Sequence, residues 1–102
     1  MPTMMMKMHI WKYELLVQES QTLELPVGAR VVALQVQRND IGNLKPHLWA
    51  LVNPEAKRET RSFRMLKTGE NQVPAECART LAYLGSFQLH DGQFVAHVFE
   101  EL

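Results

Sequence analysis

Four basic side chains recur at every third position near the middle of the chain: Arg58, Arg61, Arg64 and Lys67. This spacing would suit one face of a helix, but the run Phe63-Arg-Met-Leu66 and the neighbouring threonines favour a strand. On a strand, Arg61 shares a face with Phe63 and Met65, whereas Arg58 and Arg64 project from the other face. A guanidinium beside apolar side chains is suited to holding a phosphate or carboxylate. We therefore expect Arg61 and Arg64 to bind a ligand; the alternative is a solvated surface whose Arg stems cover apolar area.

Aromatic residues could complete such a ligand site. Trp11 and Trp49 could each stack on a base at the mouth of a pocket, although both residues also suit a core. His97 lies between Val95 and Phe99 on one face of an expected strand. It is a candidate ligand-binding residue or a hydrogen-bonded histidine of the core or its rim.

Signals for catalysis or a metal site are absent from the sequence. The histidines do not fall at a metal-ligand spacing, and the single cysteine, Cys77, has no histidine close in sequence to act as its base. Glu100 and Glu101 would point to opposite faces of a strand, so they could not share a proton, and solubilising charge is their expected role. We predict a protein that is not an enzyme and that needs neither a metal nor a cofactor.

The elements that must position these residues are strands. Apolar residues alternate with polar ones in seven short segments separated by Pro, Gly, Asn and Asp. A tail at residues 1–7 and one domain at 8–102 are expected, with at most one helical turn, near residues 74–79. The fold class is all-β: a six- to seven-stranded antiparallel sandwich or barrel. The expected strands are 8–16, 22–25, 29–37, 47–52, 59–66, 81–89 and 93–100.

Strict alternation also predicts which side chains share a face. Val32, Leu34 and Val36 should lie together, as should the residues of a second set on the sixth strand: Leu81, Tyr83, Phe87 and Leu89. The Asp91-Gly92 pair predicts a type I′ hairpin turn. Segments 47–52 and 93–100 are apolar on both faces, which indicates the middle of the sheet system or a subunit interface.

Composition excludes several classes of function. The chain has 102 residues, of which 46% are hydrophobic and 22% charged, as is usual for a globular domain. The 11 basic and 11 acidic residues give a formal net charge of zero. Binding to DNA or RNA is not expected without a basic footprint, and no segment is long and apolar enough for a membrane span. Low net charge favours self-association, and we expect a homo-oligomer.

Several stretches of the chain together form a recognisable sequence pattern. They are Ile10-Trp-Lys12, Gln21-Thr-Leu-Glu-Leu-Pro-Val-Gly-Ala29, Leu48-Trp-Ala-Leu-Val-Asn-Pro-Glu-Ala56, Glu59-Thr-Arg61 with Phe63, Thr68-Gly69, Tyr83-Leu-Gly-Ser-Phe-Gln88 and His97-Val-Phe-Glu100. This pattern resembles a family of small, functionally unassigned proteins of tailed phages and prophages. At 68–74 this chain reads Thr-Gly-Glu-Asn-Gln-Val-Pro where that family tends to read Thr-Gly-His-Pro-Ile, and the loop at 38–45 is longer, which would change one rim of any pocket.

This resemblance implies a phage accessory protein that acts in the host bacterial cytoplasm. One expected function is counter-defence, in which oligomer pockets sequester a nucleotide-derived immune signal. The alternative is an inhibitor that masks a host protein through a sheet edge or an apolar patch. The expected ligand contacts are Arg61 and Arg64 to phosphate, and Trp49 or Trp11 to a base. Arg61→Ala is expected to weaken binding without harming the fold, since we expect Arg61 to face solvent.

Overall fold

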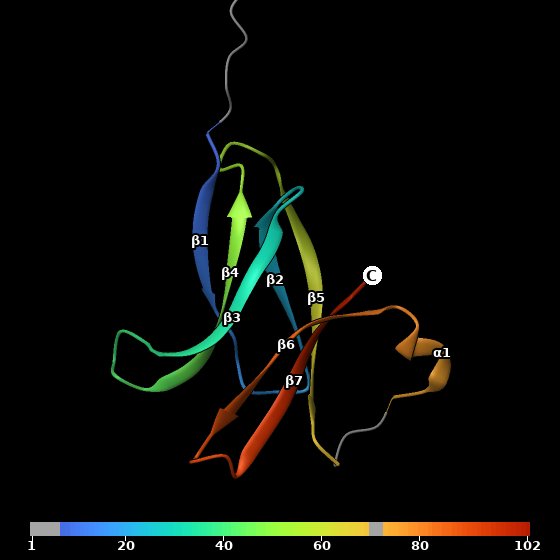
Figure 1. Ribbon diagram of the computed structural model, residues 1–102. Helices are drawn as coiled ribbons and strands as arrows, with labels where there is room; N and C mark the ends of the chain where they lie inside the picture. The colour runs from blue at the N-terminus through green and yellow to red at the C-terminus, as the bar shows by residue number, and fades with distance from the viewer. Residues whose placement is uncertain (1–6, 70–72) are drawn as a thin grey trace, which may run out of the picture.

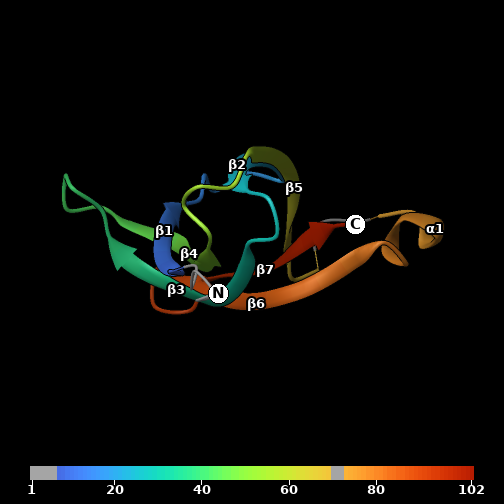
Figure 2. The ribbon, with the colours of Figure 1, turned by 90° about the horizontal axis from the view of Figure 1, so that it is seen from above.

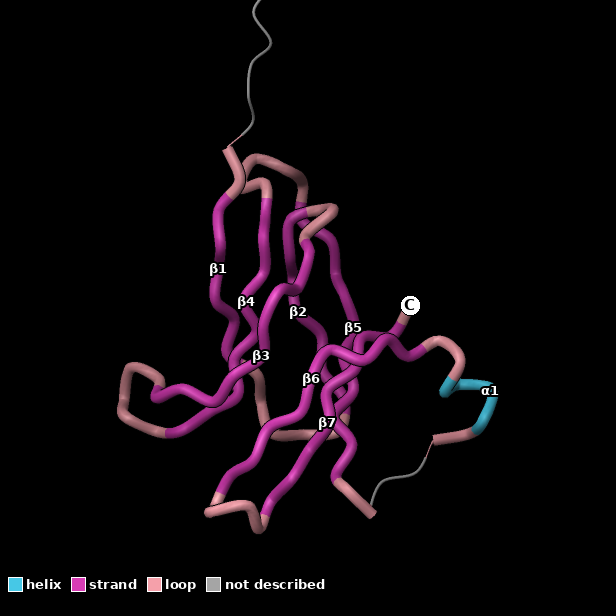
Figure 3. The backbone as a smooth tube through the Cα atoms, in the orientation of Figure 1, coloured by secondary structure: helices cyan, strands magenta, loops and turns pink. Residues whose placement is uncertain are grey.

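The computed structural model describes residues 7–69 and 73–102, and the expected tail at 1–7 lies outside these ranges except for Lys7. The seven predicted strands are confirmed, and the predicted helical turn is confirmed as a helix of four residues. Among the described residues, α1 is the only helix (Figure 3). In chain order, the elements are β1 (His9–Glu14), β2 (Ser20–Pro26), β3 (Arg30–Arg38), β4 (Leu44–Val52), β5 (Arg58–Lys67), α1 (Ala75–Ala78), β6 (Leu81–Leu89) and β7 (Phe94–Glu101).

The strands form two antiparallel sheets in a sandwich-like arrangement, and the sheets do not close into a barrel (Figures 1 and 2). One sheet has the strand order β1-β4-β3 and the other has the order β2-β5-β7-β6. The chain therefore changes sheet after β1, after β2 and after β4. β4 and β7 are both central strands, which explains why their segments are apolar on both faces.

The core fills the space between the inner faces of the two sheets. Half-buried residues such as Trp11, Tyr13 and Leu23 pack around its margin. Each fully buried Leu, Val or Phe contributes roughly 1.5–3 kcal/mol through removal of apolar surface from water. The buried cluster consists of Leu15, Leu25, Ala29, Leu48, Ala50, Val52, Phe63, Met65, Phe87, Ala96 and Val98.

A β-bulge in β3 overturns one predicted face. The register with β4 shifts between Val31 and Ala33, so that Val31 and Leu34 both pack against the core. Val32 is exposed instead of sharing a face with Leu34 and Val36. The prediction was wrong at this position because a bulge inserts one residue and so reverses the alternation on one side of it.

A second bulge, in β6, overturns the other predicted face. The register with β7 shifts between Tyr83 and Gly85, which turns Tyr83 outward while Leu84 and Phe87 face the core. Gly85 is the position where β6 approaches the opposite sheet: a Cβ there would lie 3.0 Å from Cδ2 of Leu34. Glycine at this bulge therefore permits the close contact between β3 and β6.

The β6–β7 hairpin turns at Asp91 and Gly92, as predicted. Gln93 N donates to His90 O at 3.1 Å, and Asp91 and Gly92 have positive φ, at 55° and 86°, as a type I′ turn requires. A second turn overlaps it, because Gly92 N donates to Leu89 O at 3.2 Å and His90 also has a positive φ, of 54°. Asp and His adopt this left-handed conformation more readily than most residues.

Candidate functional site

Arg61 lies on the inner face of β5 beside Phe63 and Met65, as predicted, but it does not face solvent. Its guanidinium forms two hydrogen bonds with the carboxylate of Glu100, one of them 2.7 Å long between Nη2 and Oε1. It also donates to the carbonyl oxygen of Ala29. The side chains of Arg61 and Glu100 are only 16% and 11% exposed. Two expectations therefore fail: solvent exposure of Arg61 and a solubilising role for Glu100. The expected tolerance of alanine at Arg61 loses the reason given for it.

The hydrogen bonds with Glu100 raise the pKa of Arg61 above its usual value, although burial acts in the opposite direction. Each side chain of this pair satisfies the hydrogen-bonding groups of the other within the sandwich. Through these hydrogen bonds, Arg61 of β5 links β7, at Glu100, to the segment that ends at Ala29. Its role in the structure is therefore to join these three segments.

Arg64 projects from the outer face of the four-stranded sheet. Its Nε donates to Oε1 of Glu101 at 2.5 Å, and Nη1 lies 3.6 Å from Oε1 of Glu19. The side chains of Arg64 and Glu101 are 26% and 39% exposed, so water screens this pair more than the pair formed by Arg61. The hydrogen bond with Glu101 raises the pKa of Arg64.

His97 lies on the same outer face within a chain of hydrogen bonds. Its Nε2 is 2.7 Å from Oγ1 of Thr68, and its Nδ1 is 2.6 Å from Oγ of Ser86. The Ser86 hydroxyl is in turn 2.7 Å from the hydroxyl of Tyr83, whose ring packs edge-on against Phe99. His97 is thus a hydrogen-bonded rim residue that orders an aromatic and hydroxyl-bearing surface.

The two tryptophans lie on opposite faces of the three-stranded sheet. Trp11 packs against the core, and the guanidinium carbon of Arg58 lies 5.3 Å from the centre of its ring. Trp49 lies on the outer face near His47, at 5.9 Å between ring centroids. The two rings therefore cannot flank one ligand within a single chain.

The five predicted site residues do not converge on one site. Arg64 and His97 share the outer face of the four-stranded sheet, because Arg64 pairs with Phe99 and Leu66 pairs with His97 in the β5–β7 register. The remaining three residues, Arg61, Trp11 and Trp49, occupy the sandwich interior or the other sheet.

Figure 1 shows where the β3–β4 and β6–β7 hairpins turn. Residues of both hairpins line a groove at this end of the sandwich. It comprises a cavity of about 110 Å³ and an adjoining depression of about 520 Å³, and both are lined by Val17 and Phe94. We call these two parts together the open-end groove. The cavity is completed by Gln18, Glu19, Met65 and Lys67, and the depression by Arg38, Gly42, Asn43, Leu44, Lys45, Leu89 and His90.

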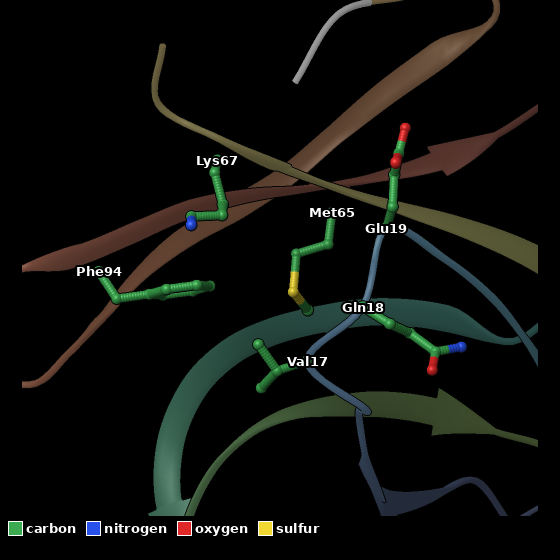
Figure 4. A pocket seen from close by; sticks show the side chains of 6 residues that line it. All are labelled: Val17, Gln18, Glu19, Met65, Lys67 and Phe94. Carbon is green, nitrogen blue, oxygen red and sulfur yellow. The ribbon is translucent and has the colours of Figure 1, made fainter. Parts of the chain in front are cut away.

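Basic groups outnumber acidic ones around the open-end groove. Its lining includes Arg38, Lys45, Lys67 and His90, against the single carboxylate of Glu19. Figure 4 shows the Lys67 amine beside the Phe94 ring, while the carboxylate of Glu19 points away from them. The amine nitrogen of Lys67 lies 5.1 Å from the centre of that ring. Positive charge beside an apolar floor suits a ligand that is anionic at one end and apolar at another.

The sequence contained two partial signals for this groove. Lys67 closes the series of basic residues that begins at Arg58, and the unusually long loop at 38–45 was expected to change one rim of a pocket. Neither signal indicated that the end of β5 and the β3–β4 hairpin would line adjoining cavities, since this depends on how the two sheets pack.

Within the described residues, no three His, Cys, Asp or Glu side chains gather in a way that could hold a metal ion. The same part of the chain contains no helix with the length and apolar character needed to cross a membrane.

The fold and the groove define a small all-β domain of two antiparallel sheets with a basic, apolar-floored opening at one end. The chain belongs to a family described as a domain of unknown function, DUF7352, whose profile matches residues 6–102. This match agrees with the expected membership of a functionally unassigned family. No curated protein and no solved structure matches the chain.

Proposed function

We propose that this protein binds and sequesters a small anionic molecule, nucleotide-derived in character, in the open-end groove. The observation that supports this most is the groove itself: the Phe94 ring and Val17 floor it, while Lys67, Arg38 and Lys45 surround it with positive charge. The larger depression, at about 520 Å³, falls within the ~300–1,000 Å³ typical of small-molecule sites.

Each part of such a ligand would meet a complementary group. A base could lie on the Phe94 ring, and phosphate oxygens could accept hydrogen bonds from Lys67 and from the cations of the β3–β4 hairpin. A charge-assisted hydrogen bond contributes roughly 1.5–3 kcal/mol, and therefore about ten- to a hundredfold in affinity. The groove replaces the earlier contact set of Arg61, Trp11 and Trp49, which the fold separates.

The biological role that follows is counter-defence by a tailed-phage or prophage accessory protein acting in the host bacterial cytoplasm. The resemblance described above supports this setting. Sequestration requires no chemical step, only tight binding that hides the signal from its receptor. We therefore propose a protein that releases its ligand unchanged rather than an enzyme.

The test is to incubate the purified protein with cyclic dinucleotides, cyclic mononucleotides and ADP-ribose derivatives, and then to remove free ligand and denature the protein by heat. Recovery of an intact nucleotide supports sequestration, and recovery of a cleaved product would show an enzyme. Lys67→Gln and Lys45→Gln should reduce retention about tenfold or more. Lys57→Gln, which removes an equal charge from an exposed position away from the groove, is the matched control.

The alternative function, masking of a host protein, is favoured by the outer face of the four-stranded sheet. Tyr83 is exposed there, packs edge-on against Phe99, and has its hydroxyl held by Ser86. An ordered, exposed tyrosine is typical of an interface anchor. If the protein retains no nucleotide, yet a single host protein co-purifies with it and is lost on Tyr83→Ala, this alternative replaces the first proposal.

A further inference from the structure

β1 is an outermost strand whose free edge carries backbone groups that could pair with another strand (Figure 1). The amide of Leu15 donates to the carbonyl oxygen of Pro46 at 2.9 Å and continues the β1–β4 register. Hydrogen-bonded residues alternate along an antiparallel strand. Trp11 and Tyr13 therefore direct their backbone groups towards β4, whereas Ile10, Lys12 and Glu14 direct theirs towards the open edge.

One position on this edge shows how a partner would bind. Leu16 continues the outward-facing series, and both of its backbone groups are taken by the side-chain amide of Gln21, at 2.9 Å to the N–H and 2.7 Å to the carbonyl oxygen. At the end of β1, the Gln21 amide thus makes the same two hydrogen bonds that the backbone of a neighbouring strand would make. Within residues 7–69 and 73–102, no hydrogen bond of this kind covers the backbone of Ile10, Lys12 or Glu14.

We propose that two copies of this chain associate through antiparallel pairing of β1 with β1 of the second copy, giving a continuous six-stranded sheet. A symmetric pairing of this type is self-complementary, as a twofold interface must be. The exposed apolar side chains along the edge support it: Ile10 is 53% and Leu16 is 56% exposed. The inference is independent of the ligand proposed for the open-end groove.

Charge complementarity selects one register among those that join outward-facing residues. Centring the twofold axis on Lys12 would place two lysines opposite one another. Centring it on Tyr13 places Lys12 opposite the partner's Glu14 and Glu14 opposite the partner's Lys12. Leu16 takes no part in the backbone pairing, because both of its backbone groups are already bonded to Gln21, so the interstrand pairs of this register are the two between Lys12 and Glu14. Opposite charges directly across two strands are stabilising, so we assign the register centred on Tyr13.

The intrachain contacts of these residues are compatible with that pairing. The Lys12 amine donates to the side-chain oxygen of Gln37 at 3.0 Å, which uses one of its three protons. A carboxylate oxygen of Glu14 lies 4.0 Å from Nε2 of His47, a distance too long for a hydrogen bond. Both charged groups can therefore accept a further partner across the edge.

Sedimentation equilibrium of the full chain at about 100 μM tests the proposal. We expect a dimer that Lys12→Pro converts to a monomer, because proline removes an outward N–H without disturbing the pairing with β4. Lys12→Glu should weaken dimerisation about tenfold or more, and Lys12→Glu combined with Glu14→Lys should restore it. Lys57→Glu is the matched control for charge. A monomeric wild type, or a Lys12→Pro protein that stays dimeric, would overturn the proposal.

A cross-linking experiment tests the register itself and does not depend on the folding of the proline variant. In a Cys77→Ser background, Tyr13→Cys should form an intermolecular disulfide under oxidation, because the two Cα atoms would lie within disulfide reach. Trp11→Cys should not form this disulfide, because in the assigned register position 11 lies opposite position 15 of the second copy, four residues from the second copy's own position 11. Efficient cross-linking through Trp11→Cys with none through Tyr13→Cys would contradict the assigned register. Circular dichroism of each variant confirms that the sheets are intact.

Discussion

Two pairs of arginine and glutamate stand on opposite faces of the same strands, β5 and β7. Arg61 with Glu100 faces the interior, and Arg64 with Glu101 faces outward. The two glutamates are adjacent in the chain, and both pairs join an arginine of β5 to a glutamate of β7. Their exposures differ, because the inner side chains are 16% and 11% exposed whereas the outer ones are 26% and 39% exposed.

The comparison teaches that strand alternation, rather than residue type, decides whether an arginine is available to a ligand. A charge inside the sandwich needs its partner to compensate for lost hydration. A charge on the outer face is screened by water, so its interaction with its partner contributes little free energy. The inner pair is therefore part of the fold, and the search for ligand contacts moves to basic residues at the open end of the sandwich.

Arg61→Ala should give the largest effect, a loss of about 3–5 kcal/mol in the free energy of unfolding, since it leaves Glu100 charged and buried without its partner. Urea denaturation measures this loss. The double variant Arg61→Met/Glu100→Leu removes both charges and should recover most of the stability. An Arg61→Ala protein as stable as wild type would show that the pair is not needed.

Gly85→Ala should cost about 1–3 kcal/mol, because its Cβ would lie 3.0 Å from Cδ2 of Leu34 where the two sheets approach. Ser86→Ala, at the next residue on the outer face, loses contacts with His97 and Tyr83 but creates no clash, and should cost about 1 kcal/mol or less. Thermal unfolding of the two variants gives the contrast. Equal losses would mean that the inner and outer faces of β6 do not differ as described.

Arg64→Ala should change the free energy of unfolding by about 1 kcal/mol or less, as is usual for a partly exposed ion pair. The wild-type contribution should also shrink in about 1 M salt, where charges on the surface are screened. Denaturation at low and high salt measures both effects. A loss as large as that of Arg61→Ala, insensitive to salt, would contradict the proposed distinction between the pairs.

The smallest expected effect is the contribution of Tyr13 to the pH dependence of the free energy of unfolding. Burial raises the pKa of Tyr13 above its usual value of 10.0, while the positive charge of Arg58 acts in the opposite direction and is the smaller of the two effects. The unfolded chain therefore loses this proton first, and stability should fall as pH rises above about 10. Tyr13→Phe should make the fall less steep. Identical pH profiles for the two proteins would show that Tyr13 does not contribute to it.

The sequence predicts the strands and the helical turn well because each is encoded by local alternation and turn residues. The predicted faces fail at Val32 and Tyr83, each beside a bulge that shifts the alternation by one residue. The Arg61–Glu100 pair joins residues that are 39 positions apart in the chain. The local alternation of polar and apolar residues cannot predict a contact over that separation. The open-end groove depends in the same way on which loops the packed sheets bring together.

The most direct test of the proposed function is calorimetric titration of three variants with whichever nucleotide the wild type retains. Lys67→Gln alters the open-end groove, Arg64→Gln alters the outer face, and Lys57→Gln alters neither. All three remove one positive charge. We predict that Lys67→Gln weakens binding about ten- to a hundredfold while the other two leave it unchanged. Full affinity in Lys67→Gln, with the loss found in Arg64→Gln, would contradict the assignment of the site to the groove.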